Sequence, residues 1–404
     1  MIRISSNFDS GAIEIASPAP AERDESIAEL SDKSSDASIE ASIDLRIRRD
    51  SHQDFTQWFH FRLRGGRGRP CVIRFLNAGQ CTYASGWEGY RAVASYDRER
   101  WFRVPTSYRD GVMTVEFTPE RDSVYVAYFE PYGWERHLAL LGRAEASPRV
   151  RVIGLGQTTE GRDIDCLDIG EDRHVDAPRP GRKHVWIIAR QHPGETMAEW
   201  FVEGLVERLI DDSDPVARAA LALADFHIVS NMNPDGSVRG NLRTSATGAN
   251  LNREWLDPSM DRSPEVFLVR QRMEETGVDL FVDAHGDEAL PYVFVAGSEM
   301  LPDFTERQRI EQAAFIATFK QASPEFQDRF GYSAGKYSSD ALKLASKWVG
   351  HRFGCLSLTL EMPFKDNADA PDERVGWNGE RSKRLGEAIL LPILANLKGA
   401  ATDR

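Results

Sequence analysis

Residues 184–212 read HVWIIARQHPGETMAEWFVEGLVERLIDD, and this stretch decides the fold of the longer part of the chain. HVWIIAR (184–190) is a short apolar run rich in β-branched and aromatic residues, which predicts a buried strand. TMAEWFVEGLVERLIDD (196–212) places apolar residues close to the helical period and predicts a helix. A strand that leads through a tight turn into a helix is typical of α/β sheets, whose ligands bind beyond the carboxyl ends of the strands.

The same alternation of strands and helices continues towards the C-terminus. Further strands are predicted at 225–231, 279–285, 292–297 and 355–363, and further helices at 263–276, 306–321 and 379–399. Ser263 is the expected N-cap of one of these helices, and Pro264 suits its first position. We therefore predict an α/β domain over residues 146–404, with a mixed sheet and helices on both of its faces.

The chain before residue 146 has a different pattern. Short runs of β-branched and aromatic residues recur between turn residues, at 42–49, 57–65, 71–79, 111–119 and 124–132. Apolar residues recur at every second position, as in Ile43, Leu45 and Ile47, which is the period of a strand with one buried face. These runs predict an all-β sandwich domain over residues 1–145. Residues 16–40 are rich in Ser, Ala, Asp and Glu, and we expect a solvated loop with short strands there.

Composition and charge exclude several classes of protein. The 404 residues carry a formal net charge of −13, so the chain lacks the basic surface that sequence-independent nucleic-acid binding needs. Its apolar runs fall far short of the ~18 residues of a membrane-spanning helix, and its N-terminus lacks the apolar core of a secretory signal. The four cysteines show no C-x-x-C spacing, which favours thiols in a reducing compartment. We predict a cytoplasmic protein that binds neither nucleic acid nor a membrane.

The turn after the strand at 184–190 contains two residues with metal-binding side chains. His192 and Glu195 are three residues apart across a Pro-Gly turn, so an imidazole and a carboxylate can face one metal ion. The spacing is H-x-x-E, which makes Glu195 a ligand and not the base between two histidines of a helix. His285 ends another predicted strand and supplies a third ligand. Two histidines and one glutamate, with a position left open for water, form a catalytic zinc set.

Each of these residues alone has an ordinary explanation, since a histidine at the end of a strand is usually a solvated residue. The combination of ligands at two strand ends favours a metal site, and we predict one Zn²⁺ per chain. Asp283 or Asp287 could orient a ligating imidazole through its second nitrogen, and the pattern leaves that choice open.

Three further residues fit the chemistry of a peptidase that acts at the end of a chain. Arg243 and Arg253 lie in a stretch rich in Gly and Asn, although most arginine pairs form surface salt bridges. Guanidinium groups bind carboxylates in a bidentate manner, and an arginine beside a scissile carbonyl can stabilise an oxyanion. Glu361 ends an apolar strand, where many carboxylates are simply exposed. Beside a metal and its water it becomes the expected proton acceptor and donor.

Together these motifs resemble the M14 family of zinc carboxypeptidases, and within it the cytosolic carboxypeptidase subfamily. The family's order is followed by HPGE (192–195), NPDG (233–236), GNLR (240–243), LNREW (251–255), DAHGD (283–287) and LTLE (358–361). NPDG in isolation is a generic turn, and the specificity comes from the combination. Three segments of the first domain resemble the β-sandwich that precedes the catalytic domain in this subfamily. They are FDSG (8–11), FTQWFHFRLRG (55–65) and AYFEPYGWERH (127–137).

The resemblance implies an activity and a role for each matching residue. His192, Glu195 and His285 match the zinc ligands, while Asn252 and Arg253 match the pair that holds the α-carboxylate of the substrate. The implied activity is zinc-dependent hydrolysis of the C-terminal peptide or glutamyl bond. The implied substrates are the C-terminal tails of peptides and proteins.

Two catalytic roles are also implied by the resemblance. Arg243 matches the arginine that polarises the scissile carbonyl, and Glu361 matches the general base. The classical members have a tyrosine that covers the substrate, for which Tyr332 and Tyr337 are the candidates here.

The resemblance further implies a preference for acidic C-terminal residues. Members of the cytosolic subfamily usually have a basic residue upstream of the general base, where it meets an acidic side chain of the leaving residue. Lys343 and Lys347 are the candidates for this residue. A local positive pocket is compatible with an acidic protein.

Other functions stay open at this point. A zinc-dependent N-acyl-amino-acid deacylase on the same scaffold would share the three metal ligands but would need the arginines less. A carboxypeptidase directed at peptidoglycan would normally need export. As a third alternative, the β-sandwich could be a binding module that recruits the chain to a protein partner.

Overall fold

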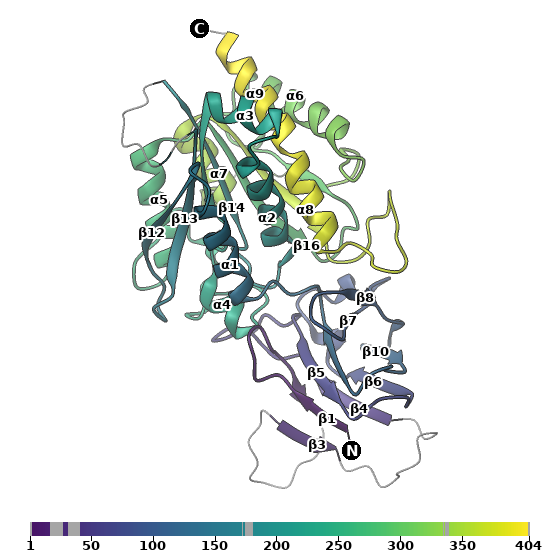
Figure 1. Ribbon diagram of the computed structural model, residues 1–404. Coiled ribbons are helices and arrows are strands. Elements are labelled where there is room, and N and C mark those ends of the chain that lie inside the picture. Colours follow the sequence, from purple (N-terminus) through teal and green to yellow (C-terminus); the bar gives the residue numbers. More distant parts are fainter. Residues whose placement is uncertain are drawn as a thin grey trace.

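The computed structural model describes residues 2–16, 27–30, 41–171, 173, 181–333, 335 and 339–402. They form a β-sandwich, which lies below a larger α/β domain in Figure 1. The chain passes through the sandwich first and then enters the α/β domain at α1 (Trp134–Glu145). The predicted fold class, an α/β domain preceded by an all-β sandwich, is confirmed.

Two sheets form the sandwich, with strand orders β3-β1-β5-β11-β7-β8 and β2-β4-β6-β10-β9. The strands are β1 (Ile2–Ser5), β2 (Glu14–Ile15), β3 (Ile27–Leu30), β4 (Ala41–Arg46), β5 (His60–Arg64), β6 (Cys71–Phe75), β7 (Val93–Ser95), β8 (Trp101–Arg103), β9 (Thr106–Arg109), β10 (Val112–Phe117) and β11 (Ser123–Ala127). Ile43 and Leu45 of β4 are buried as their alternation predicts, and they share the core with Phe61. β4 ends earlier than predicted because the backbone of Ile47 bonds to the side chain of Asn77.

A seven-stranded mixed sheet forms the centre of the α/β domain, in the order β12-β13-β15-β14-β16-β18-β17. Its strands are β12 (Val150–Gln157), β13 (Asp163–Ile169), β14 (Lys183–Ala189), β15 (Ala224–Val229), β16 (Leu280–Asp287), β17 (Phe294–Ala296) and β18 (Leu356–Pro363). β15, β14, β16 and β18 are parallel neighbours. Their carboxyl ends therefore meet at one edge of the sheet, and this edge faces the sandwich (Figure 1).

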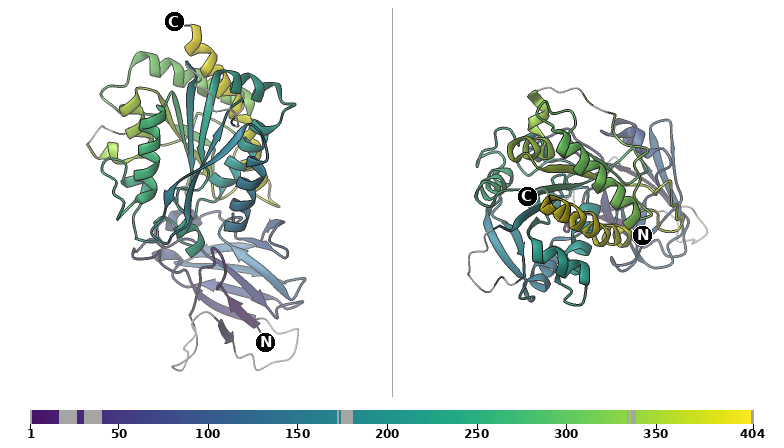
Figure 2. Two further views of the ribbon diagram at one scale, coloured as in Figure 1. Left: turned by 60° about the vertical axis from the view of Figure 1, so that its left-hand side comes forward. Right: turned by 90° about the horizontal axis from the view of Figure 1, so that it is seen from above.

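Helices cover both faces of this sheet (Figures 1 and 2). The helices of this domain after α1 are α2 (Met197–Ile210), α3 (Pro215–Leu223), α4 (Pro234–Arg239), α5 (Pro264–Thr276), α6 (Glu306–Ala322), α7 (Ala345–Phe353), α8 (Gly379–Ala388) and α9 (Leu390–Thr402), with 3-10 turns at η3 (Leu251–Arg253) and η4 (Ser339–Lys343). Two further 3-10 turns, η1 (Ala78–Gln80) and η2 (Ala84–Trp87), lie in the sandwich. Alternate residues of β14 serve the two faces. Val185 and Ile187 pack with α2, α3, α8 and α9, while Trp186 and Ile188 pack with α5 and α7. Burial on both faces explains why this strand is one continuous apolar run.

Two local predictions need correction. The helix predicted at 379–399 is two helices, because Pro392 has no N–H to donate to the carbonyl of Ala388, so α8 ends there. NPDG is not an isolated turn but the start of α4, where the side chain of Asn233 accepts a bond from the N–H of Gly236. At α5, by contrast, Ser263 occupies the N-cap position and Pro264 the first turn as predicted, although the Ser263 side chain makes no capping bond.

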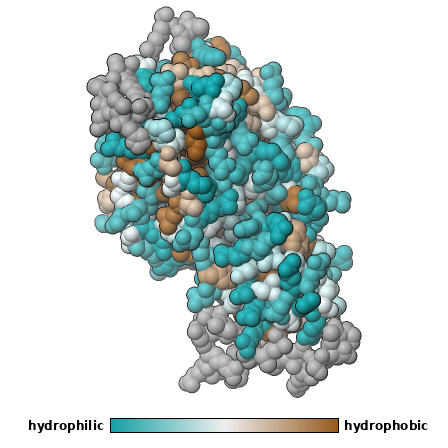
Figure 3. Space-filling model, in the orientation of Figure 1, coloured by the Kyte–Doolittle hydropathy of each residue, from teal (hydrophilic) through white to brown (hydrophobic). Residues whose placement is uncertain are grey.

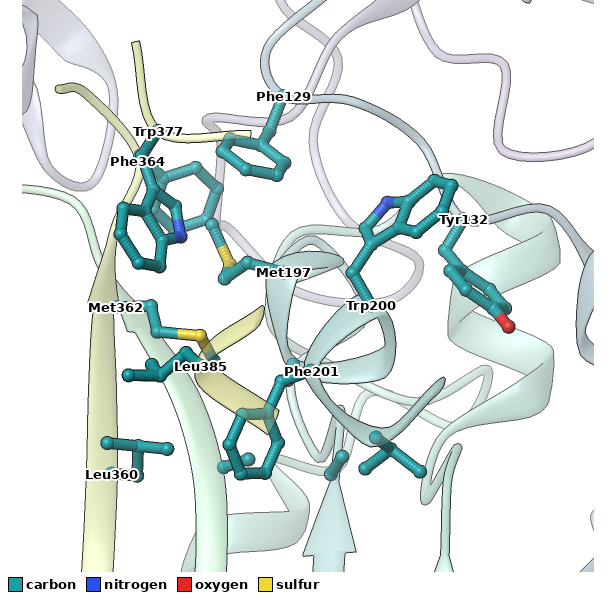
Figure 4. Packing of buried hydrophobic residues seen from close by; sticks show 14 of the residues in the cluster. Phe129, Tyr132, Met197, Trp200, Phe201, Leu360, Met362, Phe364, Trp377 and Leu385 are labelled. Carbon is teal, nitrogen blue, oxygen red and sulfur yellow. The ribbon is translucent and has the colours of Figure 1, made fainter. Parts of the chain in front are cut away.

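The two domains share a continuous apolar core beneath the functional edge of the sheet. Phe129 and Tyr132, which follow β11, lie among Trp200 of α2, Phe364 and Trp377 (Figure 4). The predicted domain boundary lies between residues 145 and 146. Helix α1 comes before this boundary in sequence, but it packs against β12 and α2 of the α/β domain.

A buried arginine also ties the sandwich to the α/β domain. The guanidinium of Arg103 in β8 donates to the carbonyl oxygens of Phe364, Lys365, Val375 and Trp377. These bonds hold the segment that follows β18. Hydrophilic side chains cover most of the face seen in Figure 3. Within the part of the chain that the structure describes, no helix combines the length and the apolar character needed to cross a bilayer.

The crossing of α2 and α8 gives a first prediction. A Cβ on Gly386 would overlap the carbonyl oxygen of Phe201, so Gly386→Ala should destabilise the protein by about 2 kcal/mol despite the better helix propensity of alanine. The matched control is Gly142→Ala in α1, where the added methyl meets open space and should stabilise by about 1 kcal/mol. Urea unfolding measures both, and equal effects of the two substitutions would contradict the close approach of α2 and α8.

Candidate active site

Three buried side chains converge where β14 and β16 end. His192 and Glu195 follow β14 in the turn that leads into α2, and His285 lies near the end of β16. One ligand atom from each residue lies within 4.8 Å of the other two. The parallel pairing of the two strands, with Ala189 opposite Ala284, places the two segments side by side.

The hydrogen-bond geometry of this cluster fits a zinc ion. Nδ1 of His192 lies 2.7 Å from Oε1 of Glu195, and Nδ1 of His285 lies 2.7 Å from Oε2. Nε2 of His192 faces Oδ1 of Asn250 at 3.2 Å, and Nε2 of His285 faces Oδ2 of Asp283 at 2.8 Å. With the proton on Nε2, each ring would donate to these oxygens and would leave its Nδ1 lone pair directed at the carboxylate side, as metal ligation requires. Two imidazole nitrogens and a carboxylate aimed at one point are the donor set of catalytic zinc.

The choice between Asp283 and Asp287 is resolved by this geometry. Asp283 is fully buried and accepts a bond from Gln191 Nε2 at 2.8 Å in addition to its contact with His285. Asp287 instead accepts a bond from the hydroxyl of Tyr332 at 2.7 Å. Burial raises the pKa of Asp283, and the neighbouring imidazole opposes that shift. Asp283 is thus the residue that orients His285.

Glu361 lies directly across the sheet from His285, since the two residues are register partners in β18 and β16. Its Oε1 accepts a bond from the Tyr332 hydroxyl at 3.0 Å. Its Oε2 is buried and has no hydrogen-bond partner among the described residues. Burial raises the pKa of Glu361 to about 8, and the charges of Glu195 and Asp287 add to the shift. One carboxylate oxygen is therefore free to exchange a proton with water or substrate.

A second group of polar residues lies next to the cluster of His192, Glu195 and His285. Asn252 in η3 places Nδ2 3.3 Å from Nε2 of His285, and its Oδ1 accepts a bond from the backbone of Ala345. Partial burial and repulsion from Arg243 both lower the pKa of Arg253, so the two guanidinium groups are electrostatic neighbours. Within the described ranges neither arginine forms an ion pair. Two close cations without a counterion form a site for a carboxylate.

Comparison with known proteins agrees with this arrangement. Residues 138–372 match the family model described as zinc carboxypeptidase, and residues 4–129 match the model of the cytosolic carboxypeptidase N-terminal domain. The chain belongs to the zinc carboxypeptidase family. It is a metallocarboxypeptidase of the cytosolic carboxypeptidase type, and its β-sandwich is the N-terminal domain of that subfamily.

Solved structures resemble the carboxypeptidase over its whole length. A metallo-carboxypeptidase from Burkholderia cenocepacia is 56% identical, with a TM-score of 0.90 and coverage of 99% of this chain and 100% of that one. A metallo-carboxypeptidase from Pseudomonas aeruginosa is 42% identical, with a TM-score of 0.88 and coverage of 98% and 99%. Human cytosolic carboxypeptidase 6 is 28% identical over 357 residues, which cover 80% of this chain and 68% of the human protein.

The two candidate lysines of the carboxypeptidase occupy different environments. Lys343, at the end of η4, is half-exposed and pairs with Asp340 at 2.8 Å. Lys347 in α7 is only 7% exposed, and its Nζ donates to the carbonyl oxygen of Gly297. Burial lowers the pKa of Lys347 to about 8, although the charges of nearby Glu299 and Asp283 oppose the shift. Lys347 is therefore a buried cation, whereas Lys343 lies at the surface.

Of the two candidate tyrosines, the structure describes Tyr332 and not Tyr337. Tyr332 is 54% exposed, and its hydroxyl bonds to both Glu361 and Asp287. It thus lies at the mouth of the site of the carboxypeptidase. Tyr337 lies outside the described residues.

Several residues that contact the site were not predicted. Gln191 accepts a bond from Trp255 Nε1 at 2.7 Å and donates to Asp283. Its position directly before the HPGE motif could have indicated a role at the site. Phe55 and Tyr83 of the sandwich lie against the Arg243 guanidinium, with ring centres 5.7 and 5.6 Å away. No local pattern connects them with Arg243, because more than one hundred residues separate them in sequence.

The bond between Asp283 and His285 gives a second prediction. Asp283→Asn removes the charge that orients His285, and the zinc affinity of the carboxypeptidase should fall about 10–100-fold. Zinc content after dialysis against graded concentrations of a chelator measures the effect. Asp287→Asn is the matched control and should leave zinc affinity unchanged. A larger loss in the control than in Asp283→Asn would reverse the assignment of the two aspartates.

Proposed function

We propose that this carboxypeptidase holds one zinc ion per chain and removes a C-terminal residue with an acidic side chain from peptides or protein tails. The observation that carries the acidic preference is the buried ammonium of Lys347. Within the described part of the chain, no carboxylate lies within 4 Å of its Nζ, which donates to the backbone carbonyl oxygen of Gly297. A buried charge without an ion-pair partner is costly, and the charges of Glu299 and Asp283 act on it from farther away, so we infer that a carboxylate of the ligand supplies the partner.

The proposed ligands of the zinc are His192, Glu195 and His285. When bound there, zinc activates water for attack and polarises the scissile carbonyl. Oε2 of Glu361 accepts a proton from the attacking water and later returns it to the departing amine. Tyr332 holds Oε1 of the same carboxylate and so fixes which oxygen is free.

A second set of residues holds the C-terminal end of the substrate. Asn252 and Arg253 bind its α-carboxylate, and Arg243 stabilises the oxyanion that forms from the scissile carbonyl. The lack of carboxylate partners for both arginines supports these roles. An N-acyl-amino-acid deacylase offers no reason for the buried Lys347, and for this reason we favour cleavage of a residue with an acidic side chain.

A solved relative is in complex with a ligand that carries carboxylate groups and a guanidino group. The metallo-carboxypeptidase from Pseudomonas aeruginosa is in complex with (2-guanidinoethylmercapto)succinic acid, and a succinic acid carries two carboxylates. In this chain, Arg253 and Lys347 would each neutralise one carboxylate of a C-terminal glutamate. Proteins with acidic C-terminal tails are therefore the proposed substrates.

The role of Lys347 gives a third prediction. Lys347→Met keeps the stem of the side chain but removes the charge, so kcat/KM for a peptide ending in glutamate should fall about 10–100-fold, because a hydrogen bond to a charged group contributes about 1.5–3 kcal/mol. The rate for the same peptide ending in alanine should change little. Steady-state release of the free amino acid measures both substrates.

The control for this prediction is Lys343→Met. Because Lys343 pairs with Asp340 at the surface, its loss should leave both rates near those of the wild type. If Lys347→Met lowered the two rates equally, Lys347 would be a structural residue and the acidic preference would have no basis in this pocket. If only Lys343→Met lowered the glutamate rate, the specificity residue would be the other lysine.

A further inference from the structure

The loop that carries Arg243 is held by a carboxylate of the other domain. Asp50, in the sandwich segment after β4, is only 7% exposed. Its Oδ1 accepts a bond from the backbone N–H of Leu242 at 2.6 Å. Its Oδ2 accepts bonds from the N–H groups of Arg243 and Thr244, at 2.8 and 2.9 Å, and from the Thr244 hydroxyl at 3.0 Å. One side chain thus binds three successive amides centred on Arg243.

Three consecutive N–H groups that point at one anion form a concave backbone site, and its bonds are stronger than neutral ones because the acceptor is charged. Neighbouring contacts hold the same loop. The backbone N–H of Ser51 donates to Asn241 Oδ1 at 3.1 Å, and Asn241 Nδ2 donates to the carbonyl of Thr244 at 2.9 Å. The sandwich therefore helps to set the position of the backbone around Arg243, together with the turn after β14, where the N–H of Gly194 donates to the carbonyl oxygen of Leu242 at 2.8 Å.

The guanidinium of Arg243 is also placed by the sandwich. It lies over the ring of Phe55, which follows Asp50 on the same segment, and over the ring of Tyr83. Cation–π contacts of this kind orient a guanidinium without neutralising it. Among the described residues its head group has no carboxylate partner, so its charge stays available to a substrate. Both ends of this side chain depend on contacts made by the first domain.

We propose that Asp50 is a positioning residue for Arg243, so that the sandwich completes the catalytic apparatus of the α/β domain. The inference rests on the proposed role of Arg243 as stabiliser of the oxyanion. Such a group works only when it is fixed before the reaction, and a displacement of about 1 Å can cost about 100-fold in rate. The alternative is that Asp50 only joins the two domains, and it makes a different prediction about coupling between the two residues.

The test is a double-mutant cycle on the full chain with zinc bound. Arg243→Met alone should lower kcat about 100–1000-fold as an oxyanion donor is lost. Asp50→Asn alone keeps the size of the side chain but removes the charge, and it should lower kcat about 10–100-fold with little change in KM. In the Arg243→Met background, Asp50→Asn should have no further effect on kcat. Zinc content and Tm are measured for every variant.

Each other outcome overturns a defined part of the proposal. If Asp50→Asn lowered kcat by the same factor in both backgrounds, in proportion to a loss of folded protein, its role would be structural only. If Arg243→Met kept wild-type kcat, the proposed role of Arg243 would fall, and the role of Asp50 would fall with it. The first result leaves the proposed function standing, so the two failures are distinguishable.

A second variant serves if Asp50→Asn does not fold. Phe55→Leu removes one aromatic face from the guanidinium without touching the interdomain hydrogen bonds. It should lower kcat in the wild-type background and not in Arg243→Met, and equal losses in both would contradict the proposal. Asp54→Asn is the control on the same segment, because Asp54 is exposed and its carboxylate pairs with Arg49 at the surface. This control should leave kcat unchanged.

Discussion

Glu195 is buried between two imidazoles, and each of its carboxylate oxygens faces one ring nitrogen at 2.7 Å. Removal of a carboxylate and two imidazoles from water is costly unless every polar atom finds a partner. The partners here are Asn250 and Asp283 for the outer ring nitrogens and the backbone N–H of Gly286 for Glu195. These partners come together at the adjoining ends of β14 and β16, where Asn250, just before η3, completes the set.

The sandwich also contributes contacts at this edge of the sheet. Arg103 holds the segment that follows β18, the strand of Glu361, and Asp50 holds the loop of Arg243. Arg103 and Asp50 lie on different parts of the sandwich, and they bind different segments of the site. A carboxypeptidase built in this way uses its first domain to hold two segments of the site. The continuous core around Phe364 and Trp377 is consistent with this arrangement.

Local patterns in the sequence predicted much of the fold and the metal cluster. His192, His285 and Glu361 each terminate an apolar run, and parallel strands bring such ends together by geometry alone. The break between α8 and α9 was missed although Pro392 signalled it. Contacts between distant segments could not be predicted. Asp50 and Arg243 are 193 positions apart, and no local pattern in either segment indicates a contact with the other. The choice of Lys347 over Lys343 also required the structure, because it depends on which residues of η4 and α7 face inward.

The proposed function requires that this enzyme act from a free C-terminus through bound zinc. Mass spectrometry of a peptide ending in glutamate, prepared with a free or an amidated C-terminus, tests the claim directly with zinc-loaded and chelator-treated protein. We expect the zinc-loaded protein to release one glutamate from the free acid and nothing from the amide, and the chelated protein to release nothing. Cleavage of the amidated peptide, cleavage at an internal bond, or full activity after removal of zinc would contradict the account.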